Sequence, residues 1–208
     1  MAWMRAALIW AVVAGTIAVS LGVAAMSPLL AWRGPVYVVA GFAGVSALAL
    51  VLLQPLLVAG LLPGLSIPRG RRVHRWVGAA LVTAIIIHVA GLWLTSPPDV
   101  VDALLFDSPT PFSAWGVVAM WAAFAAALLA ALRRPLRIRP RLWRLGHTVL
   151  VVLVVLGGVV HALLIDGTMG SASKLVLCAL VVAATAVALF NLRAWMALTR
   201  RKPQDRRP

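Results

Sequence analysis

The sequence is poor in cysteine and in charged residues. Of its 208 residues one is a cysteine, and only 12% are charged. Because Cys178 lies inside an apolar run, neither a disulfide framework nor a cysteine metal site is available. The chain is 63% hydrophobic and has a mean hydropathy of +1.01, which excludes an ordinary soluble domain. We interpret it as an integral membrane protein.

Acidic residues are also scarce, and the formal net charge is +14. Such a charge could indicate a nucleic-acid partner. However, the basic residues lie in the loops between apolar runs and lack the interleaved aromatic residues of a nucleic-acid-binding surface. We therefore expect no nucleic acid as partner and interpret these charges as topology signals in a lipid bilayer.

Six apolar runs are each close to the twenty or so residues that a membrane-spanning helix needs. Proline, glycine and serine fall between the runs, as is typical of loops. We therefore predict an all-α fold, a six-helix membrane bundle that forms a single domain over residues 1–208. The predicted helices cover approximately residues 6–26, 36–62, 73–95, 112–132, 145–165 and 172–197.

The charges predict how the helices are oriented. If the N-terminus is cytoplasmic, every lysine and arginine except Arg33 and Lys174 lies on the cytoplasmic side, as the positive-inside rule requires. Four of the five acidic residues then lie on the opposite side. We expect both termini in the cytoplasm and the protein in the plasma (inner) membrane. The four outer acidic residues are Asp99, Asp102, Asp107 and Asp166.

The first run has an alternative interpretation. It begins with a basic residue and ends among small residues, so it could be a signal peptide that is cleaved after export. Its apolar stretch is longer than the usual core of a signal peptide, so we expect a spanning helix. The later helices keep their orientation in either case.

The four histidines of the chain form a regular pattern. His74 and His88 begin and end the stretch HRWVGAALVTAIIIH, and His147 and His161 do the same in HTVLVVLVVLGGVVH. Fourteen residues are two heptads, so both rings of a helix project from one face, about 21 Å apart along the axis. The third and fifth helices are parallel because one returning helix separates them. We therefore predict the pairs His74/His147 at the inner end and His88/His161 at the outer end.

Haem fits between two facing imidazoles, because its iron takes two axial ligands and its macrocycle is flat and apolar. Zinc fits less well, because a structural zinc site normally takes four ligands. The alternative is that the histidines only pack or hydrogen-bond within the bundle, although ionisable residues inside spans are costly and tend to be functional. Nearby glycines could leave room for a flat ring or could serve helix packing: Gly78, Gly91, Gly157 and Gly158.

The stretches RRVHRWVGAALVTAIIIH and RLWRLGHTVLVVLVVLGGVVH resemble the ferric reductase-like transmembrane domain. This six-helix haem module is shared by ferric reductases, NADPH oxidases and the haem-binding subunit of the bacterial methionine sulfoxide reductase system. The resemblance implies two b-type haems in a core over residues 73–165. It assigns His74 and His147 to the inner haem iron, and His88 and His161 to the outer haem iron.

We therefore expect a di-haem cytochrome that relays electrons to an acceptor on the outer side. No glycine-rich nucleotide-binding fingerprint is present, so we expect a separate flavoprotein or a quinol as the electron donor. Arg75 and Arg144 flank the inner ligands and could pair with haem propionates, or they could simply be topology signals. The alternative function is a haem-free transporter or assembly subunit whose histidines pack or relay protons.

Overall fold

The computed structural model describes residues 2–200, and it describes the side chains of residues 3–191. Within residues 2–200 the fold is all-helical, and six helices are long and apolar enough to cross a membrane, which confirms the predicted six-helix membrane bundle. The helices are α1 (Ala2–Ala25), α2 (Pro35–Val58), α3 (Ile67–Thr95), α4 (Pro97–Leu104), α5 (Pro111–Leu132), α6 (Pro140–Leu164) and α7 (Ser171–Arg200), with a 3-10 turn, η1, at Pro28–Leu30.

Two predicted helix starts are wrong. The third helix begins at Ile67 rather than near 73, and the fifth spanning helix begins at Pro140 rather than near 145. Hydropathy marks only the apolar part of each helix, whereas the backbone stays helical through the basic residues before it. A proline in the first turn of each helix sets the start, because its fixed φ suits a helix and its missing N–H is not needed there.

A short helix, α4, occupies the segment that we expected to be an outer loop. Pro97 and Pro98 open it, and Ser96 donates a hydrogen bond to the Asp99 carboxylate at 2.5 Å. Val100 is buried, whereas Asp99 and Asp102 are exposed, so the helix is amphipathic. Hydropathy does not find such a helix, because it is only eight residues long.

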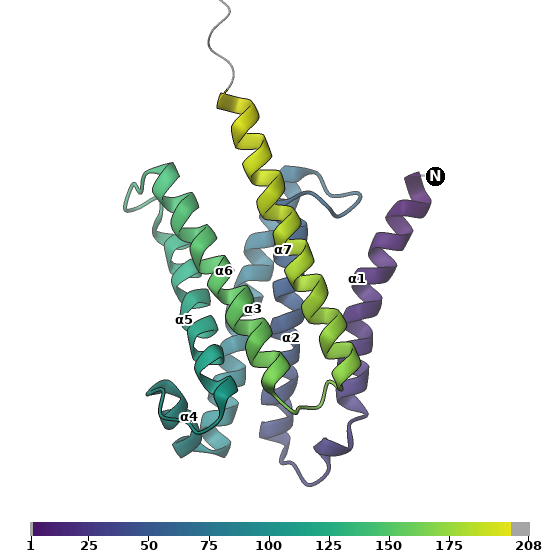
Figure 1. Ribbon diagram of the computed structural model, residues 1–208, viewed down its shortest axis with the longest axis vertical. Coiled ribbons are helices and arrows are strands. Elements are labelled where there is room, and N and C mark those ends of the chain that lie inside the picture. The colour runs from purple at the N-terminus through teal and green to yellow at the C-terminus, as the bar shows by residue number, and fades with distance from the viewer. Residues whose placement is uncertain (1, 201–208) are drawn as a thin grey trace, which may run out of the picture.

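Helices α3 and α6 run in the same direction, as predicted (Figure 1). The α2–α3 and α5–α6 loops lie at the same end of the bundle as the N-terminus, and α4 lies at the other end. The arginines of the α5–α6 loop and those near the starts of α3 and α6 therefore gather at one end. The basic tail beyond Arg200 is outside the described residues, and which end faces the cytoplasm stays a prediction.

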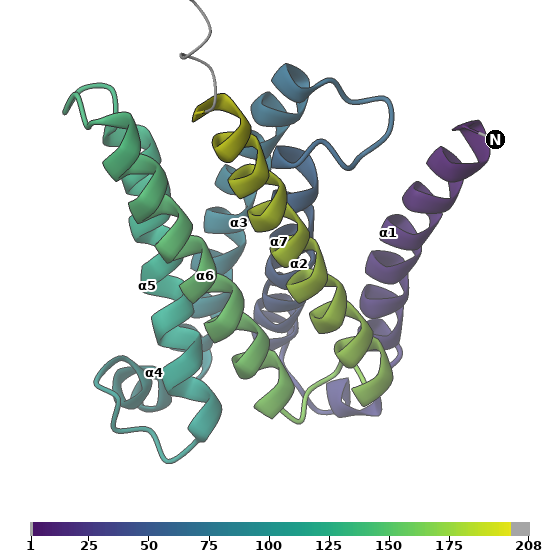
Figure 2. The same cartoon turned by 45° about the horizontal axis from the view of Figure 1, so that its top comes forward.

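The helices form two antiparallel hairpins. Helix α2 packs along α3, and α5 packs along α6, while α7 and α1 cover the first hairpin (Figure 2). The second hairpin is attached mainly through α6 against α7 and α5 against α3. Helices α3 and α6, which carry the histidines, make almost no close backbone approach to each other.

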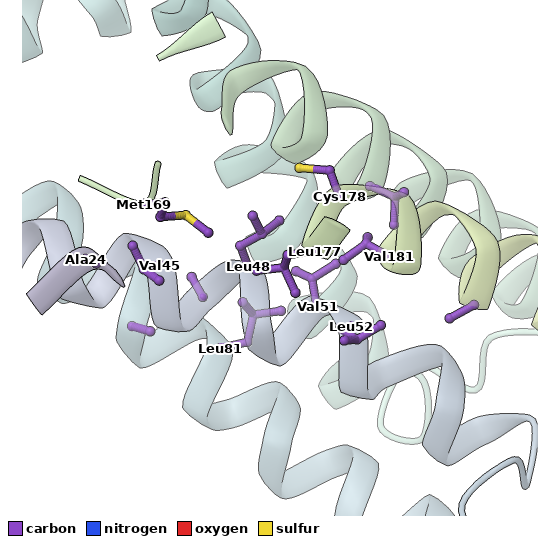
Figure 3. Close-up of a cluster of buried hydrophobic side chains, with 14 residues drawn as sticks. Ala24, Val45, Leu48, Val51, Leu52, Leu81, Met169, Leu177, Cys178 and Val181 are labelled. Carbon is purple, nitrogen blue, oxygen red and sulfur yellow. The ribbon is translucent and has the colours of Figure 1, made fainter. Parts of the chain in front are cut away.

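The hydrophobic core lies mainly where α7 covers the first hairpin (Figure 3). Leu177 and Val181 of α7 are completely buried, and they lie in one cluster with Leu48 and Leu52 of α2 and Leu81 of α3. Many other apolar side chains, such as Leu8 and Val19 of α1, are exposed, as expected for helices whose outer faces contact lipid tails.

Glycines allow the two helices of each hairpin to approach closely. A Cβ atom at Gly70 would lie 2.6 Å from the carbonyl oxygen of Leu57, and a Cβ at Gly157 would lie 2.8 Å from that of Trp115. Small residues at helix interfaces let backbones meet in this way in membranes. Within each hairpin this close packing sets the height of α3 against α2, and of α6 against α5.

We predict that Gly70→Ala destabilises the protein, by about 1–3 kcal/mol if the cost is that of ordinary overpacking. The added methyl group would press on rigid backbone, and this strain should outweigh the better helix propensity of alanine, about 1 kcal/mol. Thermal unfolding in detergent measures the effect. Gly22→Ala in α1 is the control, because no described atom lies within 4 Å of its Cβ position. Equal stability of the two variants would contradict the prediction.

Candidate functional site

The structure brings the four histidines together in the two predicted pairs. The ring centroids of His74 and His147 are 6.4 Å apart with an interplanar angle of 77°, and those of His88 and His161 are 6.5 Å apart at 80°. His74 is the eighth residue of α3, and His147 is the eighth residue of α6. The inner pair therefore lies two turns inside the bundle, not at the helix starts where the sequence placed it.

The ring separations match those of two imidazoles bound to opposite sides of one metal ion. A metal–imidazole nitrogen bond of about 2 Å, together with about 1.2 Å from that nitrogen to the ring centre, gives centroids about 6.4 Å apart. Edge-to-face aromatic pairs have centroids about 4.5–7 Å apart, so the separation of the rings agrees with a T-shaped contact as well as with a shared metal ion. Both pairs thus have the ring separation that two imidazole ligands of one metal ion require.

Each pair offers two donors and no more. Among the residues that the structure describes, no group of three or more histidine, cysteine, aspartate or glutamate side chains could hold a metal ion. A bare zinc ion would lack protein ligands at such a site. A metal in a planar macrocycle brings its own four nitrogen ligands and needs two more from the protein, the number that each histidine pair offers.

Backbone carbonyl groups hold the outer pair. The Nδ1–H of His88 donates to the carbonyl oxygen of Ala40 in α2 at 2.7 Å, and that of His161 donates to Phe112 in α5 at 2.8 Å. A carbonyl can only accept, so Nδ1 carries the proton and Nε2 keeps its lone pair. This is the usual way in which a metal-binding histidine is oriented and made more basic.

The inner pair lacks these hydrogen bonds. His74 Nδ1 and His147 Nδ1 are buried without a hydrogen-bond partner among the described residues, although they lie close to the backbones of Gln54 and Ala126. Gln54 is fourteen residues after Ala40, and Ala126 is fourteen after Phe112, the same spacing as between the histidines. Each hairpin therefore repeats one arrangement. The outer histidine donates a hydrogen bond to a backbone carbonyl of the neighbouring helix, whereas the inner histidine lies near that helix's backbone without a hydrogen bond.

Two glycines that the sequence analysis missed leave the space that the outer imidazole rings occupy. A Cβ atom at Gly44 would lie 2.9 Å from His88 Nδ1, and one at Gly116 would lie 2.6 Å from His161 Nδ1. Each glycine follows the accepting carbonyl by four residues, one helical turn. The absence of a side chain there opens the carbonyl to the imidazole. A comparison of the two hairpins could have found them, because Gly44 precedes His88, and Gly116 precedes His161, by nearly the same interval.

The glycines expected near the rings serve other contacts. Gly91 packs against Ala40, and Gly157 packs against Trp115 and Ala119, so helix packing is the correct interpretation for both. Gly78 faces the side-chain amide of Gln54. At Gly158 no described atom lies within 4 Å of a Cβ position, so its use for a flat ring stays a prediction.

The two predicted arginines lie near the inner end. Arg75 and Arg144 are exposed. Arg144 lines a depression of about 350 Å³ together with Trp143, Arg133 and Arg134. The positive charge suits an anionic group at this end, but the pairing of Arg75 and Arg144 with propionates stays a prediction.

Comparison with known proteins gives one match. A family model described as "Ferric reductase like transmembrane component" matches residues 40–158, which include α3 with both of its histidines and α6 as far as Gly158. No curated protein and no solved structure matches the chain.

We predict that Gly116→Ala displaces the His161 ring. The new methyl group would lie 2.6 Å from Nδ1, so the hydrogen bond to Phe112 should break and the separation from His88 should change. A structure of the variant measures both distances. Gly158→Ala, three residues before His161 on α6, is the matched control, because its Cβ meets no described atom within 4 Å. Unchanged rings in Gly116→Ala would show that the glycine does not shape the site.

Proposed function

The chain belongs to the ferric reductase-like transmembrane family, and we propose that its two histidine pairs are the axial ligands of two b-type haems. His74 and His147 would hold the inner haem, and His88 and His161 the outer one. The observation that carries the proposal is the ring separation of 6.4 and 6.5 Å across two helices that make almost no close backbone approach to each other. It supports a multi-pass membrane cytochrome with a redox role.

The residues of the chain have distinct tasks in this function. A bound haem supplies an iron that gains and loses one electron at a time. The four imidazoles bind and orient, and the carbonyls of Ala40 and Phe112 fix the outer rings through their Nδ1 protons. The apolar side chains around the helices exclude water. The two ligands on each helix are about 21 Å apart along its axis, so two haems can follow one another across most of the bilayer.

The electrons would come from the cytoplasmic side and leave on the outer side of the plasma membrane. A quinol that is oxidised to a quinone gives two electrons in two one-electron steps and releases two protons. A reduced flavin of a separate flavoprotein likewise gives its electrons one at a time. An acceptor on the outer side takes them singly. With a negative cell interior, each electron that moves outward is favoured by about 2.3 kcal/mol per 100 mV.

Haem content tests the ligand assignment. We predict that the purified protein holds two haems, that His147→Ala and His161→Ala each hold one, and that the double variant holds none. Pyridine haemochrome spectra with iron analysis, per mole of protein, are the measurement. Thr83→Ala in α3, which lies between the two ligands in the sequence, is the control and should keep both haems. A colourless wild-type protein would instead favour the haem-free transporter or assembly subunit.

Reconstitution tests the direction of transfer. In liposomes with a reductant inside and an impermeant ferric chelate outside, we predict reduction of the chelate by wild-type protein and a loss of at least tenfold in His161→Ala. The variant lacks an outer ligand, so electrons would stop at the inner site. An internal negative potential should increase the wild-type rate. Equal rates for the two proteins would exclude a relay through both pairs.

A further inference from the structure

The inner and outer pairs are held by different contacts. The outer rings donate hydrogen bonds to carbonyl groups, whereas His147 at the inner end stacks on an aromatic ring. The ring centroids of Trp143 and His147 are 5.6 Å apart, and the planes differ by only 16°. Trp143 precedes His147 by four residues, so one turn of α6 brings both side chains to the same face.

A guanidinium group lies over the same indole. The Cζ atom of Arg133 is 4.5 Å from the centre of the Trp143 ring, within the range of a cation–π contact. The end of α5 explains its position, because Ile138 N–H donates to the Arg133 carbonyl at 3.0 Å and Arg137 adopts a positive φ of 48°. This turn reverses the chain sharply and brings the last residues of α5 against the first turn of α6.

The contact is specific to one of the two inner ligands. The residue four positions before His74 is Gly70, which is packed against the backbone of Leu57 and has no side chain to stack. His147 therefore has an aromatic neighbour where His74 has none among the described residues. Neither inner Nδ1 has a hydrogen-bond partner there, so the stack on Trp143 is a contact that restricts rotation of the His147 ring.

We propose that Trp143 and Arg133 are positioning residues of the inner haem site. The indole fixes the plane of the His147 imidazole, and the guanidinium holds the indole. This inference rests on the proposed haem ligation and assigns a role to two residues outside the ligand set. It also makes the two sites chemically unequal. Hydrogen bonds to carbonyls make the outer imidazoles more basic, which favours ferric iron and lowers the potential. We therefore assign the higher midpoint potential to the inner haem.

Two spectroscopic measurements test the proposal on the full-length haem protein. The EPR spectrum of a low-spin ferric haem reports the angle between its two axial imidazole planes, and a potentiometric titration followed by visible absorption gives both midpoint potentials. The His161→Ala protein, which keeps only the inner haem, assigns the signals. Trp143→Leu removes the stack, and Trp143→Phe keeps an aromatic ring. Arg133→Gln and Arg134→Gln remove the same charge from adjacent positions, but only Arg133 contacts the indole.

We expect Trp143→Leu to shift or broaden the inner EPR signal and to move the inner potential, while the outer signal and potential stay unchanged. Trp143→Phe should lie close to wild type. Arg133→Gln should change the inner EPR signal in the same direction as Trp143→Leu, and Arg134→Gln should leave that signal unchanged. If Trp143→Leu loses the inner haem, the inner EPR signals of Trp143→Phe and Arg133→Gln test the positioning role instead.

Three results would overturn the proposal: an inner signal that is insensitive to Trp143→Leu, identical spectra for the two arginine variants, or equal effects on both haems. A wild-type protein without haem would instead refute the proposed function itself. A haem-containing wild-type protein whose inner signal does not respond to Trp143→Leu would refute the positioning role and leave the proposed function standing.

Discussion

The fold depends on one constraint: α3 and α6 must be held parallel and apart. The imidazole centroids are 6.4 and 6.5 Å apart, and the helices that carry these rings make almost no close backbone approach to each other. Each helix is instead supported from behind by the other member of its hairpin. Helix α2 supports α3 through glycine contacts, and α5 supports α6 in the same way. The geometry of the site is therefore set by helices that contribute no ligand.

In both hairpins the N–H of a histidine ring lies in a low-dielectric environment and needs a hydrogen-bond acceptor. A neutral imidazole inside lipid needs a partner for its N–H, since unsatisfied polar groups are costly there. A helix carbonyl already accepts one intrahelical bond but has a second lone pair, and a glycine one turn later uncovers it. Ala40 with Gly44, and Phe112 with Gly116, use this arrangement at the outer end. At the inner end, His147 stacks on Trp143, and Arg133 lies over the same indole.

The sequence predicts the number of spanning helices, their parity and the pairing of histidines, because hydropathy and a spacing of two heptads carry that information directly. It does not predict that α3 and α6 begin about two turns before the inner histidines, since the basic residues there are helical without being apolar. Nor does it predict Gly44 and Gly116. Their role depends on which turn of a neighbouring helix faces the ring, and only the packing of the hairpins decides that.

The sparse contact between α3 and α6 has a consequence for biogenesis. Neither hairpin contains a complete pair, because every pair takes one ring from α3 and one from α6. A cofactor bound by both rings of a pair could be captured only after the second hairpin had entered the bilayer and packed against the first, so cofactor insertion would be a late step. Once bound, such a cofactor would also cross-link the two hairpins, which otherwise contact each other through few residues.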